Sequence, residues 1–321
     1  MSGAVQMDVE RFVAEQVAKA GTDIKGRAII ALSGGVDSTV SAILVNRAIG
    51  ERLLAVYVDT GFMRKGETEK ISSMFSRLDL NCRIVDASES FLRELEGVSD
   101  PETKRTVIGR KFIKVFEEQA ESFGADFLVQ GTIAPDWIES GGALRDRIKS
   151  HHNVGGLPEQ MKLKLFEPVR DLYKDEVRAV ARHLGVEVAE RQPFPGPGLA
   201  IRVLGPITRE RIELEREACA IVEEQIERAY TEGKLSALPW QYFCVLLPVR
   251  SVGVQGDVRA YGDTVVVRAV KSVDAMTARF SDIPHEILED ISTKMTNRLG
   301  SKITRVVYDV TNKPPATIEW E

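Results

Sequence analysis

The sequence has little cysteine, no excess of basic residues and no long apolar run, and each shortage excludes a class of protein. Its 3 cysteines in 321 residues are widely spaced and form no C-x-x-C pair, which argues against a disulfide framework and a cysteine-rich zinc site. The 43 Lys and Arg against 48 Asp and Glu give a net charge of −5, whereas a general nucleic-acid coat has a basic excess. No stretch approaches the roughly 18 apolar residues of a transmembrane helix, and no signal-peptide pattern follows Met1. We therefore expect a cytoplasmic protein with no nucleic-acid and no membrane partner.

Two common nucleotide-binding signatures are also missing. The Gly-Lys-Ser/Thr ending of a Walker A loop does not occur, and neither does the G-x-G-x-x-G fingerprint of dinucleotide-binding folds. A nucleotide-binding loop in this chain must therefore have another form.

The first half of the chain alternates predicted strands with predicted helices. The strands are short apolar runs, at 28–32, 53–58, 82–85 and 126–130. The helices have apolar residues at helical spacing, over 36–49, 104–123 and 174–184. This alternation is typical of βαβ units, so we expect an α/β fold with a parallel twisted sheet and helices on both faces.

The composition changes at Pro193-Phe-Pro-Gly-Pro-Gly198, which neither a helix nor a central strand can accommodate. We place a domain boundary there, between residues 192 and 193. The elements predicted beyond it are helices over 208–230 and 284–299 and strands over 241–249, 264–271 and 302–310. Because strands outnumber helices, we expect a smaller α+β domain with a mostly antiparallel sheet.

The most informative segment directly follows the first predicted strand and reads Ser33-Gly34-Gly35-Val36-Asp37-Ser38-Thr39. Its glycines allow a sharp turn, and the helix that follows directs free N–H groups and a partial positive charge into that turn. Asp37 would repel an anion bound there unless a divalent cation such as Mg²⁺ lay between them. The segment therefore predicts a site for pyrophosphate and Mg²⁺; the alternative is a tight turn whose serines only cap the helix.

This heptapeptide resembles the PP-loop of the N-type ATP pyrophosphatases, which cleave ATP between the α and β phosphates and adenylate an acceptor oxygen. Five further stretches resemble the GMP synthetases of that family, at 131–139, 150–158, 193–205, 247–256 and 305–321. The resemblance implies an adenine-nucleotide alpha-hydrolase-like, ATP-pyrophosphatase domain over 1–192 and a dimerisation and XMP-binding domain over 193–321. It implies a C–N ligase that aminates XMP to GMP through an adenylyl-XMP intermediate. ATP would be a substrate and Mg²⁺ the cofactor, and AMP and pyrophosphate would be released.

Many GMP synthetases also carry an N-terminal glutamine amidotransferase domain with a Cys nucleophile. Here only about 27 residues precede the first predicted strand, and none of Cys82, Cys219 and Cys244 lies in a glycine-flanked nucleophile turn. The resemblance is therefore to the separate synthetase subunit of a two-subunit enzyme. It implies that ammonia comes from a separate glutamine amidotransferase subunit, and that the chain forms a homodimer through its C-terminal domain.

The resemblance also implies roles for individual residues. ATP would be bound by the seven residues from Ser33 to Thr39, by Asp59 and by Gly131, and for Asp59 the capping of the next turn stays open as an alternative. XMP would be bound by Arg105, Gln255, Lys313, Ile318 and Glu319. The alternatives without a binding role are that Arg105 is an ordinary surface charge and that the residues from 313 onward form a frayed tail.

The segment 132–158 resembles the lid that closes over ATP and XMP in this family. Its implied catalytic residues are Asp136, Glu139, Lys149, His151 and His152. Asp136 would hold Mg²⁺ together with Asp37. The alternative is a solvated surface loop, although a loop of this length in a compact domain is usually functional or disordered.

Two other functions stay open at this point. With a different acceptor, the same loop would serve an NAD synthetase, an argininosuccinate synthetase or a tRNA-thiolating enzyme; the acidic composition and scattered cysteines speak against the last. A non-catalytic nucleotide sensor would bind ATP and dimerise, but Asp37 and the charged lid speak against it.

Overall fold

The computed structural model describes residues 7–135, 163–186, 192–273 and 275–321. The chain divides into two compact units, one made of residues 1–60, 68–87 and 109–190 and the other of residues 61–67, 88–108 and 191–321. Within the described ranges, no helix is both long enough and apolar enough to cross a membrane.

The second unit includes two segments from the first half because their backbones pair with it. Leu199 N donates to Phe62 O at 2.8 Å, and Ile207 N donates to Val98 O at 3.0 Å. The units are therefore not continuous in sequence. The two-domain division between residues 192 and 193 stays a prediction.

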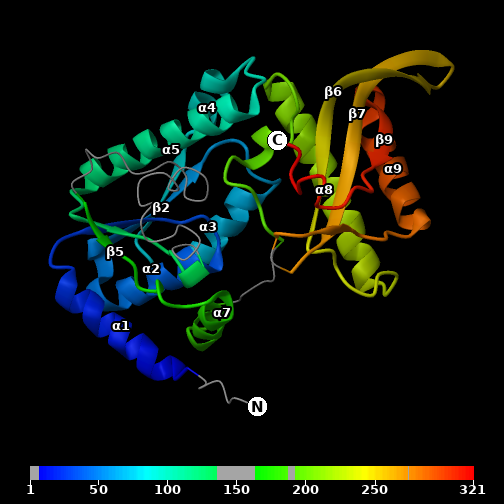
Figure 1. The fold of residues 1–321 in the computed structure, drawn as a ribbon. Coiled ribbons are helices and arrows are strands. Elements are labelled where there is room, and N and C mark those ends of the chain that lie inside the picture. Colours follow the sequence, from blue (N-terminus) through cyan, green and yellow to red (C-terminus); the bar gives the residue numbers. More distant parts are fainter. Residues whose placement is uncertain (1–6, 136–162, 187–191, 274) are drawn as a thin grey trace. The chain divides into compact units, whose positions relative to one another are not determined.

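The first unit is built on a five-stranded parallel sheet with the strand order β3-β2-β1-β4-β5 (Figure 1). The strands are β1 (Ala28–Ala31), β2 (Leu53–Asp59), β3 (Cys82–Asp86), β4 (Phe127–Val129) and β5 (Lys164–Phe166). In β1 and β2, consecutive side chains are buried, as a sheet covered on both faces requires. Because all neighbouring strands pair in parallel, their carboxyl ends lie at one edge.

The helices of this unit pack against the sheet and against one another through apolar faces. They are α1 (Val9–Asp23), α2 (Val36–Ile49), α7 (Lys174–His183) and most of α3 (Glu67–Arg77) and α5 (Pro101–Phe123). α1, α2 and α7 share one apolar cluster, which includes Val13, Leu44 and Val177. On α5, Phe116 is buried, and Gln119 accepts a hydrogen bond from Arg83 of β3 at 2.8 Å.

The second unit packs long helices against a mostly antiparallel sheet (Figure 1). Its strands are β6 (Gln241–Gln255), β7 (Val258–Lys271), β8 (Arg279–Phe280) and β9 (Ile303–Tyr308), and its helices are α4 (Ser88–Leu95), α8 (Arg209–Thr231) and α9 (His285–Leu299). β6 and β8 pair antiparallel with β7, and β9 pairs parallel with it. α8 packs on β6 through two buried cysteines, where Cys244 N donates to Cys219 Sγ at 3.3 Å.

The predicted fold class is confirmed, and the predicted elements agree with the observed ones to within a few residues, except that β6 and β7 are longer. Sequence reasoning missed α1, α3, α4, β5 and the two-residue β8. β5 has three residues, two of them exposed, so it contains no apolar run to detect. The outer halves of β6 and β7 pair mainly with each other and carry many exposed side chains, so the apolar-run criterion also fails there.

A glycine in the second unit offers a test of this packing. Gly198 begins a short 3-10 helix with φ of +64°, and a Cβ there would lie 2.3 Å from Phe62 O. Gly233 has a similar φ of +75°, but a Cβ there would have no atom within 4 Å. We expect Gly233→Ala to lower the free energy of unfolding by about 1 kcal/mol through left-handed backbone strain, and Gly198→Ala to lower it by about 3 kcal/mol. Urea unfolding of both variants checks this; equal losses would contradict the close approach.

Candidate active site

The loop 33–39 lies at the carboxyl end of β1, the middle strand of the parallel sheet. The chain passes from β1 to β2 on one side and later to β4 on the other side. Open α/β sheets bind ligands at such a point, beyond the carboxyl ends of the strands. Gly34 has φ of +76°, and Gly35 directly precedes α2. The strand, turn and helix that a phosphate loop requires are therefore present.

The hydroxyl groups of the loop stabilise its turn. Ser38 Oγ and Thr39 Oγ1 donate to Gly35 O at 3.2 and 2.8 Å, and Gly35 N donates to Ser33 Oγ at 3.3 Å. Among the described residues, no side chain accepts a hydrogen bond from the N–H groups of residues 36–38, and Gly35 has no side chain with which to cap α2. The serines therefore hold the turn rather than cap the helix, and the positive end of α2 stays open for an anion.

Asp37, in the first turn of α2, has one paired and one unpaired oxygen. Its Oδ2 lies 2.5 Å from Nζ of Lys174, the first residue of α7. Its Oδ1 is buried and has no hydrogen-bond partner within the described part of the chain. A buried polar atom of this kind requires an explanation, and Mg²⁺ prefers carboxylate and phosphate oxygens. The residues present therefore fit a magnesium ion held by Asp37 beside bound phosphates.

Two more of the predicted ATP-binding residues lie at the same edge of the sheet. Asp59 ends β2 and Gly131 follows β4, and both strands flank β1. A Cβ on Gly131 would lie 2.8 Å from Ser38 N, so the backbone after β4 runs directly against the loop. Asp59 Oδ2 accepts a hydrogen bond from Thr68 Oγ1 of α3 at 2.6 Å, which joins the end of β2 to α3. That these residues bind ATP stays a prediction.

The predicted lid residues lie outside the described residues. They are Asp136, Glu139, Lys149, His151 and His152. Their catalytic roles, and the magnesium-binding role of Asp136, stay predictions.

In the second unit, three fully buried cations hold the C-terminal segment, which we define as residues 309–321. Lys104, Arg202 and Arg268 are all 0% exposed. Each is paired with a carboxylate of the C-terminal segment: Arg268 with Asp309, Arg202 with Glu319, and Lys104 with Glu321. Arg268 also donates to the carbonyls of Thr311 and Thr317. A buried charge that loses its partner is strongly destabilising. The C-terminal segment is therefore part of the folded unit, and the frayed-tail alternative is wrong.

The predicted XMP-binding residues are distributed over several parts of this unit. Arg105 Nη2 donates to Glu321 O, which joins α5 to the C-terminal segment. Lys313 Nζ donates to a backbone carbonyl at 2.9 Å, and Ile318 is buried. Gln255 ends β6 at the tip of the β6–β7 hairpin, which extends away from the C-terminal segment (Figure 1). That these residues bind XMP stays a prediction.

Glu319, the remaining predicted XMP-binding residue, is held by two side chains. Arg202 Nε and Nη2 donate to its two oxygens at 3.0 and 2.8 Å. Gln241 Nε2 donates to Glu319 Oε1 at 2.9 Å. Burial by itself would lower the pKa of Arg202, but the charge and hydrogen bonds of Glu319 outweigh burial and raise it. Arg202 is therefore a permanent cation whose counterion is a predicted substrate contact.

Sequence reasoning missed Lys104, Lys174, Arg202 and Gln241. Arg202, like Arg268, carried a usable signal, because each is the one charged residue of an apolar run, 199–204 and 265–270. A lone cation in a buried run is expected to be paired with an anion. Lys104 and Lys174 stand in charged helical sequence, which gives no such signal.

Comparison with known proteins locates the chain in a family. The model of the GMP synthase C-terminal domain matches residues 227–320, and the model of NAD synthase matches residues 5–109. A protein of Thermoplasma acidophilum, named as one subunit of the glutamine-hydrolyzing GMP synthase, is 57% identical over 298 residues, which cover 93% of this chain and 94% of that one. The protein of the same name from Thermococcus kodakarensis is 58% identical over 316 residues, covering 97% and 99%.

A longer relative matches nearly the whole chain as well. The glutamine-hydrolyzing GMP synthase of Geobacillus kaustophilus is 52% identical over 318 residues, which cover 98% of this chain but 61% of that protein. The phosphate loop and the parallel sheet that carries it agree with these matches, two of which cover nearly all of both chains. The chain therefore belongs to the family of separate synthetase subunits of GMP synthase, within the N-type ATP pyrophosphatases.

Proposed function

We propose that the chain makes GMP from XMP, ATP and ammonia, with AMP and pyrophosphate as the other products. The observation that carries this proposal is the loop 33–39, which combines a glycine turn, the open N-terminus of α2 and the unpaired Oδ1 of Asp37 at the carboxyl end of β1. These features suit the pyrophosphate part of ATP. The names of the full-length relatives support XMP as the acceptor.

In the first step, the oxygen on C2 of XMP attacks the α-phosphorus of ATP, and the bond between the α-phosphorus and the bridging oxygen breaks. The departing pyrophosphate gathers negative charge, which the N-terminus of α2 and the ammonium of Lys174 stabilise. Mg²⁺ held by Asp37 supplies further neutralisation when it is bound. Reactions of this kind depend mainly on positioning, which the short rigid loop provides.

In the second step, ammonia attacks C2 of the adenylated XMP, the C2–O bond breaks as AMP leaves, and the new amino group loses one proton to solvent. Water must be kept from this adenylate, and we assign that task to the lid over residues 132–158. Lys149 and His151 are the lid residues that would contact phosphates, and Asp136 would share the magnesium ion. Arg105, Gln255, Lys313, Ile318 and Glu319 would bind XMP.

The ammonia would come from a second protein in the cytoplasm. Relatives of nearly the same length are named as one subunit of a glutamine-hydrolyzing enzyme, which supports a separate subunit that releases ammonia from glutamine. None of the chain's cysteines is suited to that reaction: Cys219 and Cys244 are buried, and burial raises the pKa of Cys82 to about 11.

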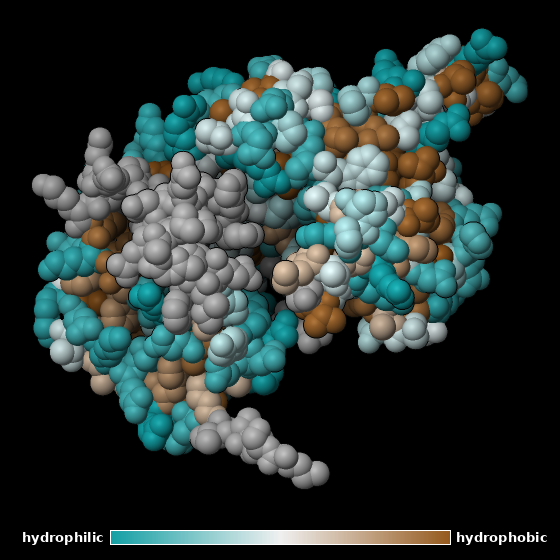
Figure 2. Space-filling view, viewed as in Figure 1, coloured by the Kyte–Doolittle hydropathy of each residue, from teal (hydrophilic) through white to brown (hydrophobic). Residues whose placement is uncertain are grey.

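The β6–β7 hairpin supports the proposal of a homodimer. Val252, Val254 and Tyr261 lie on one face of the hairpin and are 47%, 78% and 58% exposed. Figure 2 shows apolar side chains over this part of the second unit. Exposed apolar side chains along an edge strand such as β6 commonly mark a contact surface. We assign this face of the hairpin to self-association.

The first test is the nitrogen source. The purified chain supplied with XMP, ATP, Mg²⁺ and an ammonium salt should form GMP and pyrophosphate, and glutamine should not replace the ammonium salt. At fixed total ammonium, the rate should rise with pH until groups of the enzyme titrate, because NH₃ has the lone pair that attacks C2 and NH₄⁺ lacks it. Chromatography of nucleotides measures the product, with nicotinate-adenine and citrulline acceptors as controls. GMP formation from glutamine by this chain alone would contradict the proposal.

The second test is Asp37→Asn. Because a neutral amide binds Mg²⁺ poorly beside phosphates, we expect kcat/KM to fall about 100-fold with little change in melting temperature. Asp175→Asn is the matched control, since Asp175 lies in the first turn of α7 and its side chain is 94% exposed. Steady-state kinetics with a pyrophosphate-release assay measure both variants. Near wild-type turnover in Asp37→Asn would remove Asp37 from the mechanism.

The third test is the oligomeric state. Light scattering should report a dimer for the wild-type chain and a monomer for Val254→Lys, because a charged side chain in an apolar contact is costly to desolvate. Val273→Lys is the control, since Val273 is 98% exposed and lies outside the hairpin. A dimer that persists in Val254→Lys would exclude this face as the contact.

A further inference from the structure

Arg202 is buried too deeply to meet solvent and is bound to a residue that is only partly buried. The side chain of Arg202 is 0% exposed, whereas that of Glu319 is 18% exposed. The guanidinium lies 4.0 Å from the centre of the Phe243 ring and 5.2 Å from that of Phe194. These rings fix the plane of the guanidinium, and its two parallel hydrogen bonds transfer that orientation to the carboxylate.

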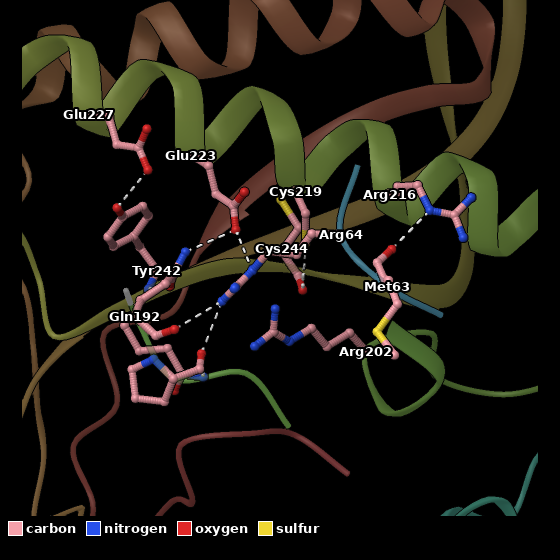
Figure 3. A network of polar contacts seen from close by, with 12 residues as sticks. Met63, Arg64, Gln192, Arg202, Arg216, Cys219, Glu223, Glu227, Tyr242 and Cys244 are labelled. Atoms are coloured by element: carbon pink, nitrogen blue, oxygen red, sulfur yellow. Dashed lines mark hydrogen bonds and ion pairs between the residues drawn. The ribbon is translucent and has the colours of Figure 1, made fainter. Parts of the chain in front are cut away.

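Of the acidic groups near Arg202 in the described part of the chain, Glu319 is the one that forms an ion pair and hydrogen bonds with it. The neighbouring Arg64 has a carboxylate of its own, Glu223, at 3.1 Å (Figure 3). Glu215 is fully buried, and burial raises its pKa well above the usual range. Glu319 is therefore the anion that neutralises Arg202.

The hydrogen bonds of Glu319 leave room for one further donor. A carboxylate has about four acceptor positions. Arg202 and Gln241 together occupy three of them, two on Oε1 and one on Oε2. Among the described residues no donor occupies the remaining position, which is on Oε2 of a side chain that is still partly exposed. A carboxylate held in this way can accept one hydrogen bond in a defined direction.

We propose that Arg202 and Gln241 are positioning residues that orient the Glu319 carboxylate so that its Oε2 accepts one hydrogen bond from a ring N–H or a ribose hydroxyl of the purine nucleotide. The inference rests on the proposed function. It deepens that proposal, because it attributes part of the affinity for XMP to two buried residues, Arg202 and Gln241, that do not themselves touch the substrate. The competing explanation is that Arg202 only anchors the C-terminal segment, as Arg268 does through Asp309 and two backbone carbonyls.

The design uses point variants, because deleting the C-terminal segment would leave the buried cations unpaired. Arg202→Lys keeps the charge and loses the two parallel hydrogen bonds. Gln241→Met removes one donor with little change in volume. Arg268→Lys is the matched control, an equally buried arginine that holds the same segment without contacting the Glu319 carboxylate. Steady-state kinetics with saturating ammonium give the KM for XMP and for ATP, and thermal melting reports folding.

We expect the KM for XMP to rise about tenfold in Arg202→Lys and about threefold in Gln241→Met, while the KM for ATP changes less than about twofold. Glu319→Gln should also raise the KM for XMP. Adding Arg202→Lys to Glu319→Gln should raise it no further, because Arg202 acts through Glu319. Arg268→Lys should lower the melting temperature and leave the KM for XMP within about twofold of wild type.

Two results would overturn the inference while the proposed function stands. One is a KM for XMP in Arg202→Lys that equals the wild-type value. The other is a KM for XMP that rises as much in Arg268→Lys as in Arg202→Lys. If Arg202→Lys fails to fold, Gln241→Met decides, and an unchanged KM for XMP there rejects the positioning role. A wild-type chain that makes no GMP from XMP, ATP and ammonium overturns the proposed function, and the inference with it.

Discussion

The second unit depends on the pairing of buried cations with the C-terminal segment. Lys104, Arg202 and Arg268 are excluded from solvent, and each is paired with a carboxylate between residues 309 and 321. Removing one partner would leave a buried charge without compensation, at a cost of several kcal/mol. The fold of this unit is therefore complete only when its last residues are in place. A segment held this firmly can present Glu319 in one orientation.

In the first unit, by contrast, polar groups of the phosphate loop have no partner among the described residues. The first turn of α2 keeps its N–H groups free, and one oxygen of Asp37 stays buried without a partner in the described part of the chain. These unsatisfied groups lie at the carboxyl end of the central strand, where a phosphate and a cation would satisfy them together. The loop of the unit that would bind ATP thus leaves polar groups open, while the buried cations of the unit that would bind XMP are paired with carboxylates of the C-terminal segment.

Much of the fold and part of the site could be predicted from the sequence. The strands of the parallel sheet, α2 and α8 follow from apolar runs and helical spacing, and the loop 33–39 follows from residue types at adjacent positions. Elements that lack such a local pattern were missed, such as the three-residue β5 and the exposed half of the β6–β7 hairpin. The participation of residues 61–67 and 88–108 in the second unit was also invisible, because no local pattern records which unit a segment joins.

By itself, the sequence determined that a phosphate loop stands between a strand and a helix, because turn, hydroxyls, acid and helix start are all neighbours along the chain. Its long matches to relatives also determined the family. Only the tertiary structure decided that Arg202 and Gln241, from distant segments, converge on the carboxylate of Glu319. The physical reason is that burial and pairing of charge arise when segments pack together, and no window of sequence contains both partners.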